Sequence, residues 1–101
     1  MRYTVRPAAR ADLKRHWHVI AKDNLAAADQ FVAAAEAEFT KIAAHPLLLG
    51  HQIGWRKEAH VRSRSIPGFW RYLIFYRVHP RHVEFKRVLH GARHLPRLFR
   101  R

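Results

Sequence analysis

One run of apolar residues constrains the fold of this chain more than any other feature. In residues 70–78, WRYLIFYRV, nearly every position is apolar, and only Arg71 and Arg77 interrupt the run. A strand that is apolar on both faces has to be covered on both sides, so this pattern predicts a strand at the centre of a sheet. We expect one face of this strand to pack in the core, with the side chains of Tyr72, Ile74, Tyr76 and Val78.

Residues 60–66 predict a neighbouring strand with one basic face. Their alternation places Arg62, Arg64 and Ile66 on one face and mostly smaller side chains on the other. Pro67 and Gly68 then turn the chain into the central strand. We expect the two arginines to project from the side of the sheet that no helix covers.

Residues 82–89 predict a third strand, at or near the edge of an antiparallel meander. The strand follows a turn at residues 79–82, and polar and apolar side chains alternate along it. We expect Val83, Phe85 and Leu89 to point inward, and the outward set to be Glu84, Lys86 and His90. A glycine ends the strand, and a short basic tail follows.

The first half of the chain predicts a short strand and then a helical hairpin. Residues 2–6 alternate and contain β-formers, and Pro7 suits the first turn of a helix. Residues 8–22 and 25–44 each carry an apolar stripe with helical spacing. The stripes consist of Ala9, Leu13, Trp17 and Ile20, and of Leu25, Ala28, Val32, Ala35, Phe39 and Ile42. The irregular segment between this hairpin and the basic strand predicts a loop.

Together these elements predict an α+β fold with an N-terminal strand, a helical hairpin and a three-stranded antiparallel meander. The strands would form one curved sheet with the helices on one face, and the other face would stay comparatively open. A chain of 101 residues is long enough for one core, so we expect a single domain over residues 1–101. Hydrophobic residues make up 49% of the chain, which argues against disorder.

The positive charge of the chain is concentrated in its second half. Residues 1–50 contain seven Lys or Arg and five Asp or Glu, whereas residues 51–101 contain thirteen and two. The net charges of the halves are therefore +2 and +11, within a total of +13. Such a field attracts polyanions and acidic protein surfaces alike, so we expect a partner of one of these kinds.

The composition also excludes several kinds of site. There are no cysteines, which excludes a disulfide framework, a thiolate zinc site and a cysteine nucleophile. No pair of histidines has ligand spacing on a predicted helix, so we expect neither a metal site nor a cofactor. No apolar segment approaches the roughly 20 residues of a membrane-spanning helix, and no signal peptide is evident. We therefore expect a cytoplasmic protein without a membrane partner.

The sequence resembles the ParE toxins of the RelE/ParE superfamily of bacterial toxin–antitoxin modules. The resemblance covers almost the whole chain and is most specific at VRSRSIPGFWRYLIFYRV, residues 61–78, and RVLHGARHLPRLF, residues 87–99. His94 stands where the family usually has Asp. The resemblance implies a RelE/ParE-like fold and a small toxin that is held inactive by a cognate antitoxin. We expect the antitoxin to bind through an acidic C-terminal segment.

The superfamily contains two mechanisms on one fold, so the fold does not choose between them. The resemblance to ParE-type members implies an inhibitor that binds DNA gyrase and traps it with cleaved DNA. RelE-type relatives instead cut mRNA in the ribosomal A site. We expect a non-catalytic gyrase inhibitor, with a ribosome-dependent endoribonuclease as the alternative and direct binding of DNA or RNA as a third hypothesis.

Cleavage of RNA through its 2′-hydroxyl requires a base, cations at the phosphate and an acid. If the chain is a nuclease, the candidates are Arg62, Arg64, Arg93, His90 and His94, with Arg87 as a further phosphate ligand. Phe99 stands where the RelE pattern places an aromatic hydroxyl, and Phe cannot donate a proton. The alternative is a structural role, with Arg87 and His90 stabilising the sheet edge and Arg93 the terminal loop. The residues expected to bind antitoxin or target are Arg62, Arg64, Arg71, Arg87, Arg93 and Arg97.

Overall fold

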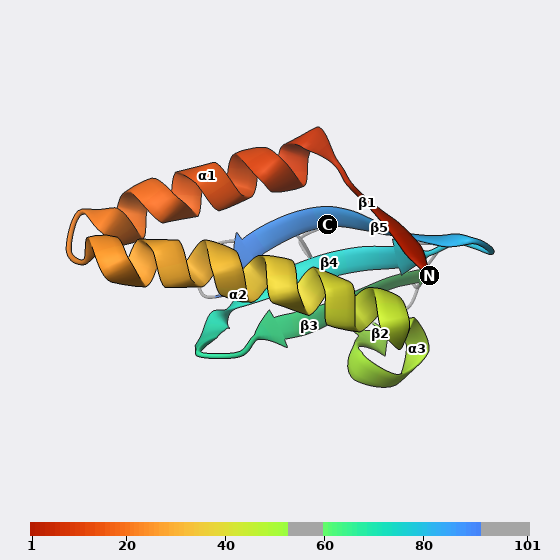
Figure 1. Cartoon of the computed structure of the whole chain (residues 1–101). Coiled ribbons are helices and arrows are strands. Elements are labelled where there is room, and N and C mark those ends of the chain that lie inside the picture. Colours follow the sequence, from red (N-terminus) through yellow and green to blue (C-terminus); the bar gives the residue numbers. More distant parts are fainter. Residues whose placement is uncertain (53–59, 92–101) are drawn as a thin grey trace.

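A computed structural model describes residues 1–52 and 60–91 of the chain. Its elements are β1 (Arg2–Val5), α1 (Pro7–Ala21), α2 (Leu25–Ala44), α3 (Pro46–Leu49), β2 (His51–Gln52), β3 (Val61–Ile66), β4 (Phe69–Val78) and β5 (His82–His90). The strands form one sheet in the order β1-β5-β4-β3-β2, and the helices lie on one face of it (Figure 1). This arrangement confirms the predicted α+β fold with a helical hairpin on one face of a single sheet.

The central position of β4 agrees with its apolar sequence. β4 pairs antiparallel with both β3 and β5, so the predicted meander is present. β1 lies parallel to β5, with Arg2 opposite His82 and Val5 opposite Phe85. The segment before β3 is more regular than predicted, because α3 forms one helical turn and β2 pairs with β3.

Local sequence determines where the two long helices begin. Pro7 occupies the first turn of α1, where its missing N–H costs no hydrogen bond. Asn24 precedes α2, and its side-chain oxygen accepts a hydrogen bond from the Ala27 N–H at 3.0 Å. The two helices run antiparallel across the sheet (Figure 1). Of the helices that the structure describes, none has the length and hydrophobicity needed to cross a lipid bilayer.

The core lies between the helical hairpin and the sheet. Fully or almost fully buried aromatic side chains come from α2, β4 and β5, and the ring centres of Phe39 and Phe85 are 4.4 Å apart. Phe31 packs in the same core. The predicted inward face of β4 is confirmed, since its side chains are buried or partly buried against this core: Tyr72, Ile74, Tyr76 and Val78.

The predicted apolar stripes of the helices need correction. Phe31 was not in the predicted stripe and is fully buried, whereas Leu25 is 60% exposed. In α1 the buried face includes Asp12 and His16, and Trp17 is only half-buried. Alanine suits either face of a helix, so the alanine-rich sequence of α2 leaves the rotation of the helix about its axis undetermined.

A β-bulge in β5 changes which side chains face the core. Phe75 pairs with Arg87, but the next residue of β4, Tyr76, pairs with Phe85. Lys86 is therefore an extra residue on β5. Because side chains alternate along a strand, the extra residue places His90 on the helix-covered face and Leu89 on the opposite face. The predicted orientations of Leu89 and His90 are therefore wrong. Phe75 and Leu89 are both buried, so the face away from the helices is less open than predicted.

Candidate partner-binding surfaces

The two arginines of β3 point toward the helices. Arg62 and Arg64 are paired with Tyr76 and Ile74, whose side chains lie in the core, so they share the helix-covered face of the sheet. Ile66 occupies the same face and is fully buried. The prediction that the arginines project from the uncovered side is therefore wrong.

Glu38 of α2 and backbone carbonyls in and just after α3 accept hydrogen bonds from both guanidinium groups. Arg62 donates to the carbonyl oxygen of Leu47 at 2.9 Å and to that of Gly50. Arg64 donates from Nε to a carboxylate oxygen of Glu38 at 2.7 Å and from Nη1 to the carbonyl oxygen of Leu49 at 3.1 Å. The register of β3 places the arginines on this side. The last carbonyls of a helix have no partner within it and favour nearby cations, so they are suited to accept from these guanidinium groups.

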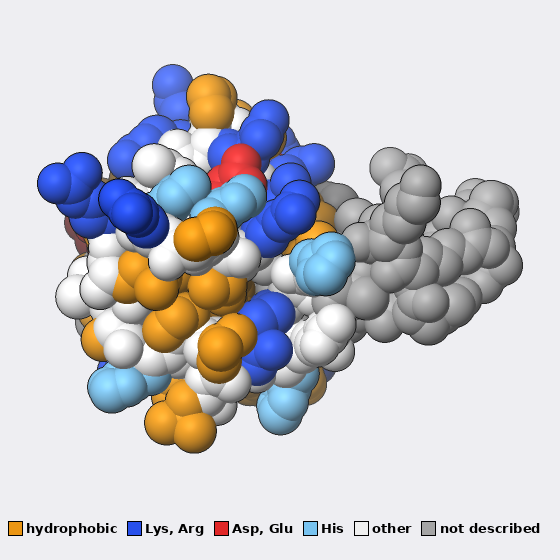
Figure 2. All heavy atoms as spheres, turned by 90° about the vertical axis from the view of Figure 1, so that its right-hand side faces the viewer, with side chains coloured by type: hydrophobic (Ala, Val, Ile, Leu, Met, Phe, Trp, Pro, Cys, Tyr) orange, Lys and Arg blue, Asp and Glu red, His pale blue; other side chains and the backbone are white. Residues whose placement is uncertain are grey.

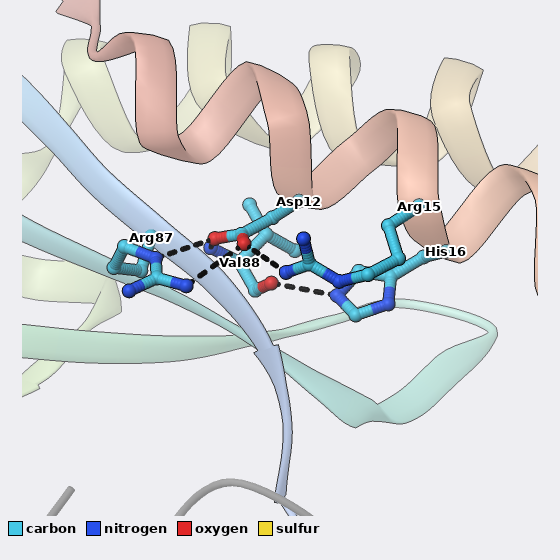
Figure 3. Close-up of polar contacts among 5 residues, drawn as sticks. All are labelled: Asp12, Arg15, His16, Arg87 and Val88. Atoms are coloured by element: carbon cyan, nitrogen blue, oxygen red, sulfur yellow. Dashed lines mark hydrogen bonds and ion pairs between the residues drawn. The ribbon is translucent and has the colours of Figure 1, made fainter.

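Asp12 and His16 of α1 close the free edge of β5 (Figure 3). β1 ends at Val5, so among residues 1–52 and 60–91 no strand pairs with the edge of β5 beyond Phe85. The carboxylate of Asp12 accepts the Val88 N–H at 2.9 Å, and His16 donates from Nε2 to the Val88 carbonyl oxygen at 2.7 Å. Two side chains one helical turn apart thus replace the two hydrogen bonds that a strand would make.

The same carboxylate pairs with Arg87. Arg87 donates from Nε and Nη2 to the two oxygens of Asp12 at 2.8 and 3.0 Å, and Arg15 also donates to Asp12. Burial by itself would raise the pKa of Asp12, but the hydrogen bonds from Arg87, the Val88 N–H and Arg15 outweigh it and lower the pKa. The hydrogen bonds to Asp12 raise the pKa of Arg87 in turn. Asp12 is therefore a carboxylate at neutral pH and joins α1 to β5.

The remaining predicted site residues occupy different environments. Arg87 is held by Asp12, and His90 is buried with its ring centre 5.0 Å from that of Tyr72. Arg71 is exposed on β4. Three predicted residues lie outside the described part of the chain, namely Arg93, His94 and Arg97. Phe99 lies outside it as well.

A shallow hollow lies between α1 and α2. Its volume is about 350 Å³, and Leu13, Trp17 and Val32 supply its apolar walls. Trp17 donates from Nε1 to Asp29 at 2.9 Å, which orients the indole ring. The polar residues that line the hollow are mainly basic and comprise Arg10, Lys14, His18 and Glu36. Apolar walls with a basic rim suit an acidic segment that also carries apolar side chains.

A second exposed apolar area lies at the end of the molecule that holds the N-terminus, α3 and the turn between β4 and β5 (Figures 1 and 2). Figure 2 shows Lys and Arg side chains around a group of hydrophobic side chains on this face, with little acidic surface. The exposed apolar residues of these segments include Met1, Leu47 and Leu48.

Within residues 1–52 and 60–91, no group of three or more potential ligand side chains could hold a metal ion.

The comparison with known families identifies the chain. Residues 3–95 match the family described as ParE toxin of type II toxin–antitoxin system, parDE. The chain belongs to the ParE toxin family. The match spans nearly the whole sequence and includes the motif at residues 61–78 and residues 87–95 of the motif at 87–99. Membership in the ParE family confirms the predicted toxin class.

A solved structure supports the ParE fold independently. A chromosomal ParDE toxin–antitoxin system from P. aeruginosa contains a chain that is 17% identical and superposes with a TM-score of 0.71. The match covers 87% of this chain and 92% of that chain. At this level of identity the likeness shows the fold. No curated protein matches the sequence.

Sequence reasoning missed the buried polar residues that organise this ParE fold. Asp12, His16 and Glu38 are each 1–2% exposed. A usable signal is present in α1, because Asp12 and His16 are four residues apart and flank Leu13 on the apolar stripe. Polar side chains within an apolar helix face indicate buried hydrogen bonds, which require partners on a neighbouring element.

Proposed function

We propose that this chain is a toxin that binds DNA gyrase and inhibits it without a catalytic step of its own. Membership in the ParE toxin family supports the toxin class. The engagement of Arg62 and Arg64 supports a non-catalytic mechanism, because Glu38 and backbone carbonyls already occupy their guanidinium groups. An RNA phosphate would have to displace these acceptors. Gyrase acts in the cytoplasm, so the proposal places the toxin there.

Inhibition of DNA supercoiling tests the proposed target. Purified chain added to gyrase should abolish supercoiling of relaxed plasmid and should accumulate complexes with cleaved DNA. The result that would overturn the proposal is intact supercoiling together with codon-positioned cuts in ribosome-bound mRNA. That outcome would favour the endoribonuclease alternative, in which Arg93 and His94 would be the first residues to replace.

We also propose that a cognate antitoxin neutralises the toxin through an acidic segment seated in the hollow between α1 and α2. The hollow combines a concave apolar wall of Leu13, Trp17 and Val32 with the cations Arg10 and Lys14. A concave site buries more of an inserted apolar side chain than a flat surface does. Acidic side chains of the same segment would meet the basic rim.

Charge reversal at the rim tests this placement. Lys14→Glu should weaken antitoxin binding by about tenfold or more, because it replaces attraction with repulsion beside the hollow. Lys22→Glu is the matched control, since it makes the same change in net charge at an exposed residue that does not line the hollow. Equal weakening by both variants in a titration by calorimetry would mean that only the overall charge matters. The proposed seat would then be wrong.

A further inference from the structure

A tryptophan lies exposed near the turn between β3 and β4. Trp70 is 70% exposed, although Phe69 and Tyr72 of the same strand pack inward. The ring centres of Phe69 and Tyr72 are 5.3 and 4.8 Å from that of Phe31 in the core. An indole has a large apolar surface whose burial is favourable, so an exposed Trp beside a well-packed core suggests contact with another molecule.

The backbone directs Trp70 away from the core. Ile66 pairs with Phe69 across the turn, but the next paired residues are Ser65 and Leu73, so β4 has extra residues between these pairs. Bulges of this kind commonly re-aim a side chain. The turn itself is well defined, because Gly68 adopts a φ of 84°, which glycine accepts readily. Trp70 is therefore presented by a strand and not by a long loop.

Arg71 is stacked beside the indole. Its guanidinium carbon lies 5.1 Å from the centre of the Trp70 ring, within the range of a cation–π contact. Such a contact orders both side chains before binding and reduces the entropy lost on association. Trp and Arg are also two of the residue types most enriched among the side chains that dominate protein interfaces.

We propose that Trp70 and Arg71 are the main contact between the toxin and its target protein, at an acidic surface with an apolar recess for the indole. This inference rests on the proposed function, in which the target is gyrase. A protein partner fits better than a nucleic acid, because Arg71 already covers one of the two ring faces on which a base could stack. The pair lies on β4, whereas the proposed antitoxin seat lies on α1 and α2.

Replacement of the two side chains tests the proposal with three readouts. Trp70→Ala and Arg71→Ala should each raise the toxin concentration for half-inhibition of gyrase by about tenfold or more. Both variants should keep the wild-type melting temperature and antitoxin affinity, since the side chains are exposed. Leu25→Ala is the control, because Leu25 is also exposed and belongs to neither surface. It should leave inhibition unchanged.

Each contrary outcome identifies which inference fails. If Trp70→Ala inhibited gyrase as strongly as the wild type, the proposed contact would be overturned. The same holds if the variant lost antitoxin affinity by the same factor as gyrase inhibition. If the wild-type chain leaves gyrase active, the gyrase proposal fails, and growth inhibition by the induced toxin becomes the readout for the contact. Trp70→Ala that remains as toxic as wild type would then overturn it. If Trp70→Ala bound a single-stranded oligonucleotide more weakly than the wild type but kept its toxicity, the pair would be assigned to nucleic-acid binding. A wild-type chain without toxicity would overturn both the gyrase proposal and the proposed contact.

Discussion

At the scale of single residues, Asp12 connects the helix layer to the sheet. Its carboxylate accepts hydrogen bonds from the Val88 N–H, from Arg87 and from Arg15, and is 1% exposed. Each donor would be left without this acceptor if the carboxylate were removed. An unpaired buried donor costs more than the original hydrogen bond contributed, so the site is sensitive to substitution.

Removal of the Asp12 carboxylate should lower stability substantially. We expect Asp12→Ala to reduce the free energy of unfolding by about 2–3 kcal/mol, because the buried Val88 N–H loses its acceptor and the more exposed Arg87 loses its ion pair. Urea denaturation measures the change. Asp23→Ala, at an exposed aspartate in the turn after α1, should change the free energy by less than about 0.5 kcal/mol. Similar losses in both variants would contradict the role assigned to Asp12.

Glu84 makes stability depend on pH. It accepts hydrogen bonds from His79 at 2.9 Å and Arg6 at 2.8 Å, and these lower its pKa from 4.5 to about 2. A carboxyl with a lowered pKa in the folded state contributes stability above its unfolded value, which is lost as pH falls from about 4.5 to about 2.

Glu84→Gln should remove this part of the pH dependence. The variant should lose about 1–2 kcal/mol at neutral pH, after allowance for solvent screening of the partly exposed partners. Its free energy of unfolding should then change less than that of the wild type between pH values of about 5 and about 2. Urea titrations at several pH values measure both curves. Parallel curves for the two proteins would show that Glu84 is not responsible.

At the scale of elements, the short helix α3 organises the end of the sheet. Its carbonyl groups receive the guanidinium groups of β3, and the hydroxyl of Tyr76 donates to the Pro46 carbonyl oxygen at 2.7 Å. Gly50, directly after α3, has no side chain, which allows the ring of Tyr76 to lie close to the backbone there. A Cβ at that position would lie 2.0 Å from the hydroxyl oxygen of Tyr76 and 2.7 Å from its ring.

Gly50→Ala should therefore destabilise the protein by overpacking. We expect a loss of about 1–3 kcal/mol, because Tyr76 is fully buried and cannot move aside freely. Thermal unfolding measures the loss. Tyr76→Phe removes the nearest atom, so Gly50→Ala should cost less in that background than in the wild type. Equal costs in the two backgrounds would show that the clash with the hydroxyl is not the cause.

At the scale of the whole molecule, the net charge of +13 governs encounter with partners. If the antitoxin segment is acidic as proposed, the association rate should fall about tenfold or more between about 0.05 M and about 0.5 M NaCl, whereas dissociation should change less. Stopped-flow mixing measures both rates. Lys14→Gln should reduce the salt dependence of association. Association that is insensitive to salt would contradict an acidic segment.

Much of the fold could be predicted because local patterns carry it. The apolar run of β4 and the helical spacing in α1 and α2 each follow from burial alone. The bulge at Lys86, which reverses the orientation of His90, was not predicted. The sequence marks its position, because the alternation breaks where the charged residues Lys86 and Arg87 are followed by the apolar Val88. For the candidate site, the spacing correctly placed Arg62 and Arg64 on one strand face, but it did not show that this face meets α2 and α3.

The sequence by itself determined the class of fold, the central strand, the helical hairpin and the resemblance to ParE toxins, because each depends on residues close together along the chain. The tertiary structure alone decided that Asp12 and His16 seal β5, that Arg62 and Arg64 are held internally and that Trp70 and Arg71 stand exposed. The physical reason is that periodicity states which side chains share a face, whereas the partner of each face depends on contacts between distant segments.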